Sequence, residues 1–242
     1  MPNRSKLQAA IGLRLICLVV LSIAGCMQTR GGGNEPPRNL TSEDLAPFIQ
    51  AGCQNGSDDY LDCANASFRS QFHCFSTSLQ VMGDGLSLEP SMVLVACPVE
   101  VYGNNLTEAQ MEGFFYCSGG MLRTCTSYVA WDGSKFVQIR NPDALARFAA
   151  PISSEGEALA FIILSKDVIR TVERGPLPSL AAKAQKNESG FLVTAYSHNT
   201  FGCYDKVDYE EVRFQVSPEG KIEELGRKVV YTRNLGYAVC VD

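Results

Sequence analysis

Several stretches of the chain alternate apolar and polar residues with a period of two, which is typical of half-buried β-strands. In the clearest of them, residues 126–140, two β-rich runs lie on either side of Asp132-Gly133. This dipeptide is preferred in tight two-residue turns, so the segment predicts a β-hairpin. The alternation in residues 66–76 predicts a further strand. The apolar run in residues 92–102 predicts a buried one, with an edge or a bulge at Pro98.

A second hairpin is predicted near the C-terminus, where residues 190–198 and 209–216 are rich in β-forming side chains. The segment 217–221 is a turn sequence in which Gly220 is available for positive φ. The chain then returns through 227–233. Because the end of a returning strand lies beside the start of the outgoing one, we expect Cys240 next to Cys203.

Short helices are predicted where residues that favour helix caps precede periodic apolar segments. A capping box at a helix start pairs Ser or Thr with Glu or Gln three residues later. The predicted helices are 41–50 (capped by Thr41 or Ser42, interrupted near Pro47), 106–117 (capping box Thr107–Gln110), 141–152 (Asn141 cap, Pro142 first), 153–165 (capping box Ser154–Glu157, buried stripe Leu159, Ile162 and Ile163) and 178–190 (ended by Gly190).

Helices followed by a meander of antiparallel strands indicate an α+β fold rather than alternating βαβ units. We therefore expect antiparallel sheets with short helices, stapled by disulfides. In the second half we expect a curved sheet on a helix, as in cystatin-like folds. The predicted organisation is a signal segment (1–25), a flexible tether (26–39), a β-rich cysteine-stapled subdomain (40–140) and an α+β subdomain (141–242).

The N-terminal segment has the pattern of an export signal. Three cations, Arg4, Lys6 and Arg14, precede an apolar stretch of about eleven residues, and the first 25 residues contain no acid. A helix that spans a bilayer needs about 20 apolar residues. The segment therefore predicts a cleaved signal rather than a permanent membrane helix.

The apolar stretch ends in Ile23-Ala24-Gly25-Cys26, which resembles the lipobox of bacterial lipoproteins. The resemblance implies that the signal is cut before Cys26, that the thiol of Cys26 receives a diacylglycerol, and that the new amino terminus is often acylated. Several acyl chains hold a protein on a membrane stably, whereas one does so only marginally. The alternative is an ordinary signal peptide that ends in a chance cysteine.

The residues after Cys26 bear on the destination of the protein. Position +2 is Met27 rather than Asp, and by the sorting rules of enteric bacteria this favours the outer membrane of the cell envelope, on its periplasmic or surface side. Residues 28–39 contain three successive glycines and a Pro-Pro pair. Neither buries apolar surface, so this segment is expected to be a tether.

Eight cysteines remain once Cys17 and Cys26 are set aside, and an even number in an exported chain predicts a disulfide framework. Eight cysteines allow roughly a hundred pairings, so spacing does not settle the connectivity. The cysteines are Cys53, Cys63, Cys74, Cys97, Cys117, Cys125, Cys203 and Cys240. The favoured pairs are Cys53–Cys63 and Cys117–Cys125, which close short loops, and Cys203–Cys240; these leave Cys74 for Cys97.

Metal binding is the competing interpretation of these cysteines. Structural zinc sites use close pairs such as C-x2-C, and no two cysteines here are separated by fewer than seven residues. Asp58, Asp59 and Asp62 cluster in one small loop, but they lack the pattern of an EF-hand and are better explained as a solvated loop. We therefore expect neither a metal site nor a cofactor.

The segment from 190 to the terminal Cys240-Val241-Asp242 also resembles, more weakly, the C-terminal part of uncharacterised cysteine-rich secreted lipoproteins of myxobacteria. The motifs in question are strand, turn and cysteine, over about the last fifty residues. That family carries no assigned activity. The resemblance therefore supports only the predicted fold and the predicted export to the cell envelope.

Charge and motifs exclude some functions and leave others open. The formal net charge is -5, with no basic run, which argues against nucleic acid as a partner. The sequence contains no nucleophile elbow and no phosphate-binding loop. Its two histidines, His73 and His198, carry no catalytic motif, and the strand-end His198 is better explained as solvated. The N-x-S/T sequons at Asn39, Asn55, Asn65, Asn105 and Asn187 would matter only in a eukaryotic secreted protein.

The leading hypothesis is therefore a non-catalytic binding or structural module, held at the membrane by lipid on Cys26 and contacting an envelope protein or a small ligand. The alternatives are a small-ligand-binding protein that uses the concave face of a sheet, and a hydrolase whose site is dispersed in the sequence. A pocket with convergent polar groups would favour one of these alternatives.

Overall fold

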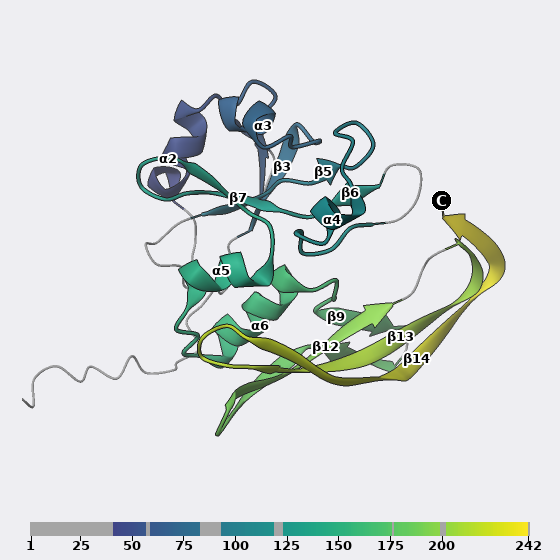
Figure 1. Ribbon diagram of the computed structural model, residues 1–242. Coiled ribbons are helices and arrows are strands. Elements are labelled where there is room, and N and C mark those ends of the chain that lie inside the picture. The colour runs from purple at the N-terminus through teal and green to yellow at the C-terminus, as the bar shows by residue number, and fades with distance from the viewer. Residues whose placement is uncertain are drawn as a thin grey trace, which may run out of the picture. The chain divides into compact units, whose positions relative to one another are not determined.

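A computed structural model describes residues 41–56, 59–82, 93–118, 123–175, 177–198 and 202–241 of the chain. These residues belong to one compact unit, Asn34–Asp242. The second unit, Met1–Gly33, contains the predicted signal and Cys26 and lies outside the described residues. The fold is α+β, with antiparallel sheets, short helices and disulfides, as predicted (Figure 1).

The first half is built on a six-stranded antiparallel sheet of order β1-β2-β3-β4-β7-β8. Its strands are β1 (Gln54–Asn55), β2 (Tyr60–Asp62), β3 (Ser78–Met82), β4 (Leu94–Ala96), β7 (Tyr128–Trp131) and β8 (Phe136–Ile139). Beside it, β5 (Val99–Glu100) pairs with β6 (Thr124–Cys125). The predicted apolar strand at 92–102 is thus present as two short strands, β4 and β5, which are separated at Pro98, where the sequence predicts an edge or a bulge.

Three short helices flank this sheet: α2 (Ser42–Gln50), α3 (Ser67–Gln71) and α4 (Glu108–Met111). The first two bury Phe48 and Phe68, whose ring centroids lie 5.6 Å apart in an edge-on arrangement. Phe136 of β8 contacts both rings. Such aromatic pairs contribute about 0.5–1.5 kcal/mol each beyond their buried area, so this cluster fixes α2 and α3 on the sheet.

The second half contains a four-stranded antiparallel meander of order β11-β12-β13-β14. Its strands are β11 (Lys183–Asn187), β12 (Gly190–His198), β13 (Gly202–Val216) and β14 (Ile222–Val241), and a separate pair is formed by β9 (Thr171–Arg174) and β10 (Leu177–Ala181). The predicted β13–β14 hairpin is confirmed. At its turn the N–H of Ser217 donates to the carbonyl of Lys221 at 3.0 Å, and Gly220 adopts φ +82°.

Two helices, α5 (Pro142–Ala149) and α6 (Glu155–Ser165), lie between the six-stranded sheet and the β11–β14 sheet (Figure 1). Both begin as predicted. The Asn141 side chain accepts from the N–H of Ala144, and the Ser154–Glu157 capping box is formed. The hydroxyl of Tyr128 donates to the carbonyl of Leu164 at 2.8 Å and joins the six-stranded sheet to α6.

Alternate residues of β4 and β7 serve two hydrophobic cores. Leu94 and Tyr128 pack into the core that contains α5, α6 and the meander, while Val95 and Val129 pack into the core of the first half. Successive strand residues point to opposite faces of a sheet. The centre of the six-stranded sheet is therefore buried on both sides.

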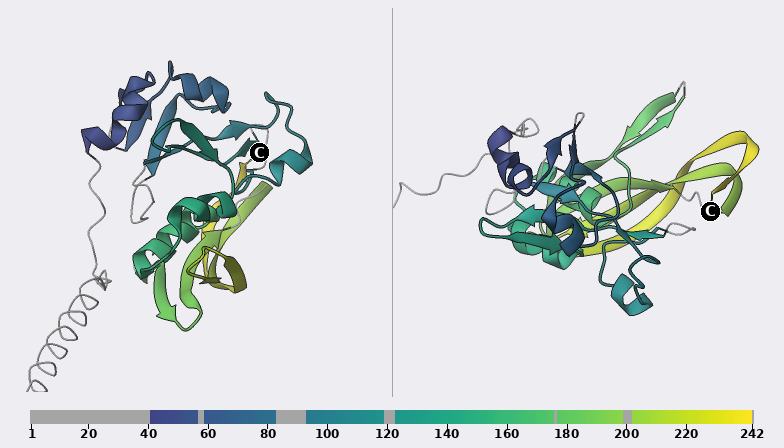
Figure 2. Two further views of the ribbon diagram at one scale, coloured as in Figure 1. Left: turned by 60° about the vertical axis from the view of Figure 1, so that its left-hand side comes forward. Right: turned by 90° about the horizontal axis from the view of Figure 1, so that it is seen from above.

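The last strand, β14, forms an edge of the meander and is interrupted by three register shifts relative to β13. Two apolar side chains on this edge, Leu225 and Val229, are exposed. In the right-hand view of Figure 2, the end of the β13–β14 hairpin that is marked C lies on the opposite side of the molecule from α2.

The prediction of a strand at 66–76 is wrong, because residues 67–71 form α3. Phe68 and Phe72 are four residues apart, a spacing that suits one face of a helix as well as one face of a strand. The prediction of a helix at 178–190 is also wrong, because β10 and β11 occupy this segment. Its Ala, Lys and Gln residues favour a helix, but pairing with β9 and β12 decides the structure.

Two details of other elements also differ from prediction. Helix α2 continues through Pro47 instead of breaking there, although its cap, Thr41, is one of the two that the sequence predicts. The turn of the β7–β8 hairpin has four residues rather than two, because Trp131 pairs with Phe136 and the Asp132 carboxylate accepts from the N–H of Lys135.

Helix α6 has no single buried stripe. Ala158, Phe161, Ile162 and Leu164 are all buried, whereas Leu159 is only half-buried. The physical reason is that the helix lies between two sheets, so that most of its circumference is covered.

Candidate functional site

Two adjoining cavities in the first half of the protein meet at His73 and Asn104, which line both. The larger, about 400 Å³, is also bordered by Arg69, Glu100 and Gly103. The smaller and more enclosed, about 260 Å³, is lined by Phe72, His73, Val99, Asn104, Leu106, Gln110, Phe114 and Arg140. The arrangement combines an apolar wall with a few convergent polar groups, which is the usual character of a small-molecule site.

The backbone places His73 by ending α3 abruptly. The N–H of Cys74 donates to the carbonyl of Arg69, and His73 between them adopts the left-handed conformation with φ +57°. Cys74 is fixed in turn by its disulfide to Cys97 and by a β-bridge to Val99. A left-handed residue other than glycine costs about 1–2 kcal/mol, and such strain concentrates at functional sites.

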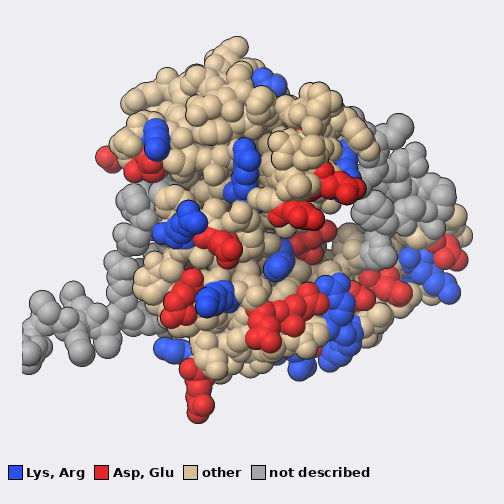
Figure 3. Space-filling view, in the orientation of Figure 1, with Lys and Arg blue, Asp and Glu red and all other residues tan. Residues whose placement is uncertain are grey.

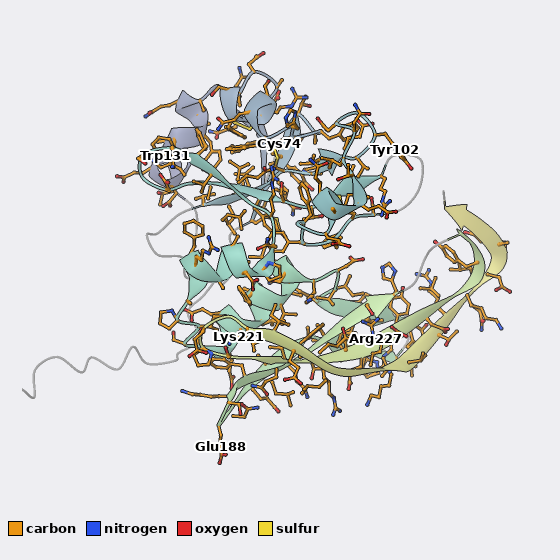
Figure 4. The ribbon with its side chains drawn as sticks, viewed as in Figure 1. Cys74, Tyr102, Trp131, Glu188, Lys221 and Arg227 are labelled. Carbon is orange, nitrogen blue, oxygen red and sulfur yellow. A yellow bond between two sulfur atoms is a disulfide. The ribbon has the colours of Figure 1, made fainter. Side chains whose placement is uncertain are left out.

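The loop after β5 forms the opposite border, and it contains another left-handed residue that is not glycine, Asn105 at φ +50°. The side-chain amide of Asn104 donates to the carbonyl of Glu100 at 2.8 Å. A Cβ atom on Gly103 would lie 2.6 Å from the Glu100 carboxylate. The absence of a side chain at Gly103 therefore lets the loop fold closely over Glu100. Figure 4 places Tyr102 of this loop at the edge of the molecule and Cys74 further inside.

A chain of hydrogen bonds orients Arg140 at the smaller cavity. Its Nε donates to Oε1 of Gln138 at 2.8 Å, and Nε2 of Gln138 donates to Oγ of Ser127 at 3.0 Å. The Ser127 hydroxyl is fully buried and donates to the carbonyl of Cys97 at 2.6 Å. The Arg140 guanidinium also lies over the ring of Phe114, 5.1 Å from its centroid. The side chain is thus held from two directions.

Arg69, in the larger cavity, has a different role. Its Nε donates to the carbonyl of Ser76, and its terminal nitrogens donate to the carbonyls of Ala64 and Phe75. These bonds hold the segment that follows α3 in place. Arg140 is therefore the better candidate for binding a ligand.

The predicted disulfides within the first half are present. The Cα atoms are 4.1 Å apart in Cys53–Cys63, 4.9 Å in Cys74–Cys97 and 3.9 Å in Cys117–Cys125. Cys203 and Cys240 are direct register partners in β13 and β14, as the hairpin argument predicts, although their side chains lie outside the described part. Cys26 lies outside the described residues altogether.

The acidic residues that the sequence singles out do not meet in one site. Asp59 precedes β2, and Asp62 is the last residue of that strand, where its carboxylate accepts from the N–H of Ala64. Asp58 is outside the described residues. Over the described ranges, no three His, Cys, Asp or Glu side chains are grouped closely enough to hold a metal ion.

The adjacent glutamates of the C-terminal hairpin are engaged by cations. Arg227 pairs with both Glu210 and Glu224, while Glu211 accepts from Lys228 and Arg213. Figure 3 shows this alternation of acidic and basic side chains along β13 and β14. Burial opposes ionisation of Glu211, but the hydrogen bonds from Lys228 and Arg213 outweigh it and lower the pKa of the carboxyl.

His198, which sequence reasoning considers as an imidazole base, lies at the end of β12. Its ring meets that of Tyr209 edge-on at 5.7 Å, and Tyr209 stacks on Tyr231 at the same distance. These contacts explain His198 as a member of an aromatic row. The sequence gives no local signal for His73 as a site residue. The residues that line the cavities with it come from segments that are far apart in the chain, in and around α3, β5, α4 and β8, and no local motif marks these residues.

In comparisons with known proteins, no protein-family model, no curated protein and no solved structure matches the chain. Among the described residues, none of the helices combines the length and the apolar character required to cross a bilayer.

Proposed function

We propose that the protein is an exported, lipid-anchored binding module of the bacterial cell envelope, and that it binds a small ligand in the cavities around His73. The observation that carries the binding part is that two cavities meet at the strained His73, and that the smaller of them is also lined by the oriented Arg140. Three disulfides in the described part are compatible with an oxidising compartment. The lipobox-like ending at Cys26 supports the anchor.

Binding without catalysis is the function that these contacts support best. A general base or nucleophile needs a partner that orients it. His73 and Glu100 both line the larger cavity, but within the described residues no hydrogen bond joins them. The side chains that are held in place are Arg140 and Gln138, and these bind or position rather than transfer protons at neutral pH.

The anchor is tested by replacing Cys26 with Ser in the full chain. We expect loss of acyl labelling and release of the protein from membranes, because the thiol that would carry the lipid is gone. Cys17→Ser is the matched control, since Cys17 lies inside the predicted signal and its loss should leave labelling unchanged. Full labelling of the Cys26→Ser protein would disprove the anchor.

The binding role is tested separately by following the amide resonances of the cavity residues while small molecules are added. Saturable shifts at residues 72–74 and 104–106 are expected for a ligand that enters the site. Shifts spread over the β11–β14 meander instead would place binding elsewhere and contradict the proposal.

A further inference from the structure

We propose that the smaller cavity binds a small monocarboxylate with an apolar body, and that the guanidinium of Arg140 pairs with the carboxylate. This inference rests on the proposed binding function and names the chemical class of the ligand. It is carried by the orientation of Arg140, the apolar lining of the cavity and its size.

The guanidinium of Arg140 is oriented so that its two terminal nitrogens can bind an anion. Its Nε is occupied by Gln138 and its guanidinium lies over Phe114. Within the described ranges, no residue accepts a hydrogen bond from its two terminal nitrogens, and no carboxylate lies within ion-pair distance of it. A guanidinium whose plane is already fixed loses little freedom when it forms two parallel bonds to a carboxylate.

The support behind Arg140 is rigid. Gln138 also donates to the carbonyl of Phe72, which itself lines the cavity, and Ser127 ties the chain of hydrogen bonds to Cys97. Cys97 is disulfide-bonded to Cys74, the residue next to His73. The cation and the strained wall of the cavity are therefore held by one connected framework. Binding groups held in this way bind without a large ordering cost.

The rest of the smaller cavity is suited to an apolar body. Phe72, Val99, Leu106 and Phe114 supply the apolar surface, while Asn104 and Gln110 provide neutral hydrogen-bonding groups. A volume of about 260 Å³ lies just below the roughly 300–1,000 Å³ of typical ligand pockets. The ligand is therefore small, on the scale of a substituted benzoate or a short fatty acid.

The surrounding charges favour one negative charge over two. Arg140 is the only side chain with a permanent positive charge among those that line the smaller cavity. Glu100 lines the adjoining cavity, as His73 does, and its carboxylate disfavours a ligand with a second negative charge. A monocarboxylate therefore fits this site better than a phosphate monoester.

The test uses the mature protein with its disulfides intact and compares benzoate with benzamide, which has a similar shape but no charge. We expect benzoate to shift the amide resonances of residues 72–74 and 104–106 saturably, and to bind at least tenfold more tightly than benzamide. Arg140→Gln should weaken benzoate binding by about 10- to 100-fold, as expected for a charge-assisted hydrogen bond, and leave benzamide unaffected. Arg147→Gln is the matched control, because Arg147 is exposed on α5 and does not border the cavity.

Arg140→Lys adds a second criterion, because it keeps the charge but removes the planar fork. Intermediate affinity for benzoate supports the paired geometry, whereas full affinity would overturn it. Equal binding of benzoate and benzamide at the cavity would overturn the carboxylate assignment and leave the binding function intact. If neither probe perturbs the cavity residues, the carboxylate assignment is wrong, while the Cys26→Ser experiment still decides the anchor. Near-ultraviolet circular dichroism confirms that each variant is folded.

Discussion

Cys203 of β13 and Cys240 of β14 lie directly opposite each other at the open end of the long C-terminal hairpin. Residues that face each other on antiparallel strands have Cβ atoms about 4.5–5.5 Å apart, which is near the separation in a disulfide. We therefore predict a fourth disulfide, Cys203–Cys240. Peptide mapping of the non-reduced protein should recover the two cysteines in one cross-linked peptide.

Loss of this disulfide should loosen the hairpin. Replacing both cysteines with Ser is expected to lower the free energy of unfolding by about 2–4 kcal/mol, because the bond constrains the unfolded chain. The measurement is denaturant unfolding of the double variant and of the parent without reductant. Alkylation of Cys203 or Cys240 in the unreduced parent would show that the bond is absent.

Gly220 is predicted to be a position where no side chain is tolerated. Its φ is +82°, and a Cβ atom there would lie 2.6 Å from the Cβ of Ala146 on α5. Gly220→Ala should destabilise the protein by about 1–2 kcal/mol through the backbone and by a further 1–3 kcal/mol or so through overpacking. Thermal and denaturant unfolding measure the effect.

Gly133→Ala separates these two causes. Gly133 also has positive φ (+97°), but a Cβ atom added there would have no other atom within 4 Å, so only the backbone cost should appear. Ala146→Gly in the Gly220→Ala background should recover part of the loss by making room. Equal destabilisation by Gly220→Ala and Gly133→Ala would argue against the steric contact.

Tyr128 joins the six-stranded sheet to α6, and we expect its phenol to contribute to the free energy of unfolding. Burial raises the pKa of this phenol, so the hydroxyl stays protonated and donates to the carbonyl of Leu164 at 2.8 Å. Tyr128→Phe leaves that carbonyl without its donor, which should cost about 1–3 kcal/mol. Tyr102→Phe, at an exposed tyrosine, is the control and should change the unfolding free energy by less than about 0.5 kcal/mol.

The ion pairs of Glu211 predict a specific dependence of stability on pH. Because the pKa of Glu211 in the folded protein is below its ordinary value of 4.5, the ionised form stabilises the fold. This contribution is complete above the unfolded value and is lost as the pH falls through the folded one. The pairs involve exposed cations, so the effect should be about 0.2–1 kcal/mol per pair.

Glu211→Gln should remove this part of the loss of stability at acidic pH when the free energy of unfolding is measured from neutral pH down to about pH 3. Glu188→Gln is the control, because Glu188 is exposed in the β11–β12 turn. Carboxyl titration by NMR should place the midpoint of Glu211 below 4.5 and raise it in the Lys228→Met variant. A midpoint that does not move in this variant would exclude Lys228 as a cause.

The elements whose residues carry their own local signals are predictable from the sequence. Asn141, Ser154 and Thr107 cap helices through hydrogen bonds within three residues, and the turn sequence at 217–221 contains a glycine that can adopt positive φ. The two disulfides that close short loops are among the pairs that the sequence favours. In contrast, the patterns of residues 66–76 and 178–190 predict the wrong element because contacts with other elements decide their structure: Phe68 packs on Phe48, and β10 and β11 pair with the neighbouring strands β9 and β12.

The candidate site is less predictable for the same reason. Phe72 and Arg140 both line the smaller cavity although they are far apart in the chain, and Gln138 connects them through a hydrogen bond to the carbonyl of Phe72. The left-handed conformation of His73 depends on a helix end and a distant disulfide. None of these relationships is visible in a window of neighbouring residues.

The irregular edge of β14 has a consequence for contacts between copies of the protein. The proposed lipid anchor would confine the copies to two dimensions, where they would meet often and with similar orientation. A straight, unpaired strand of this length would offer a long template for its neighbours. The three register shifts relative to β13 break that template into short pieces of mismatched spacing, which disfavours strand pairing between copies of the protein.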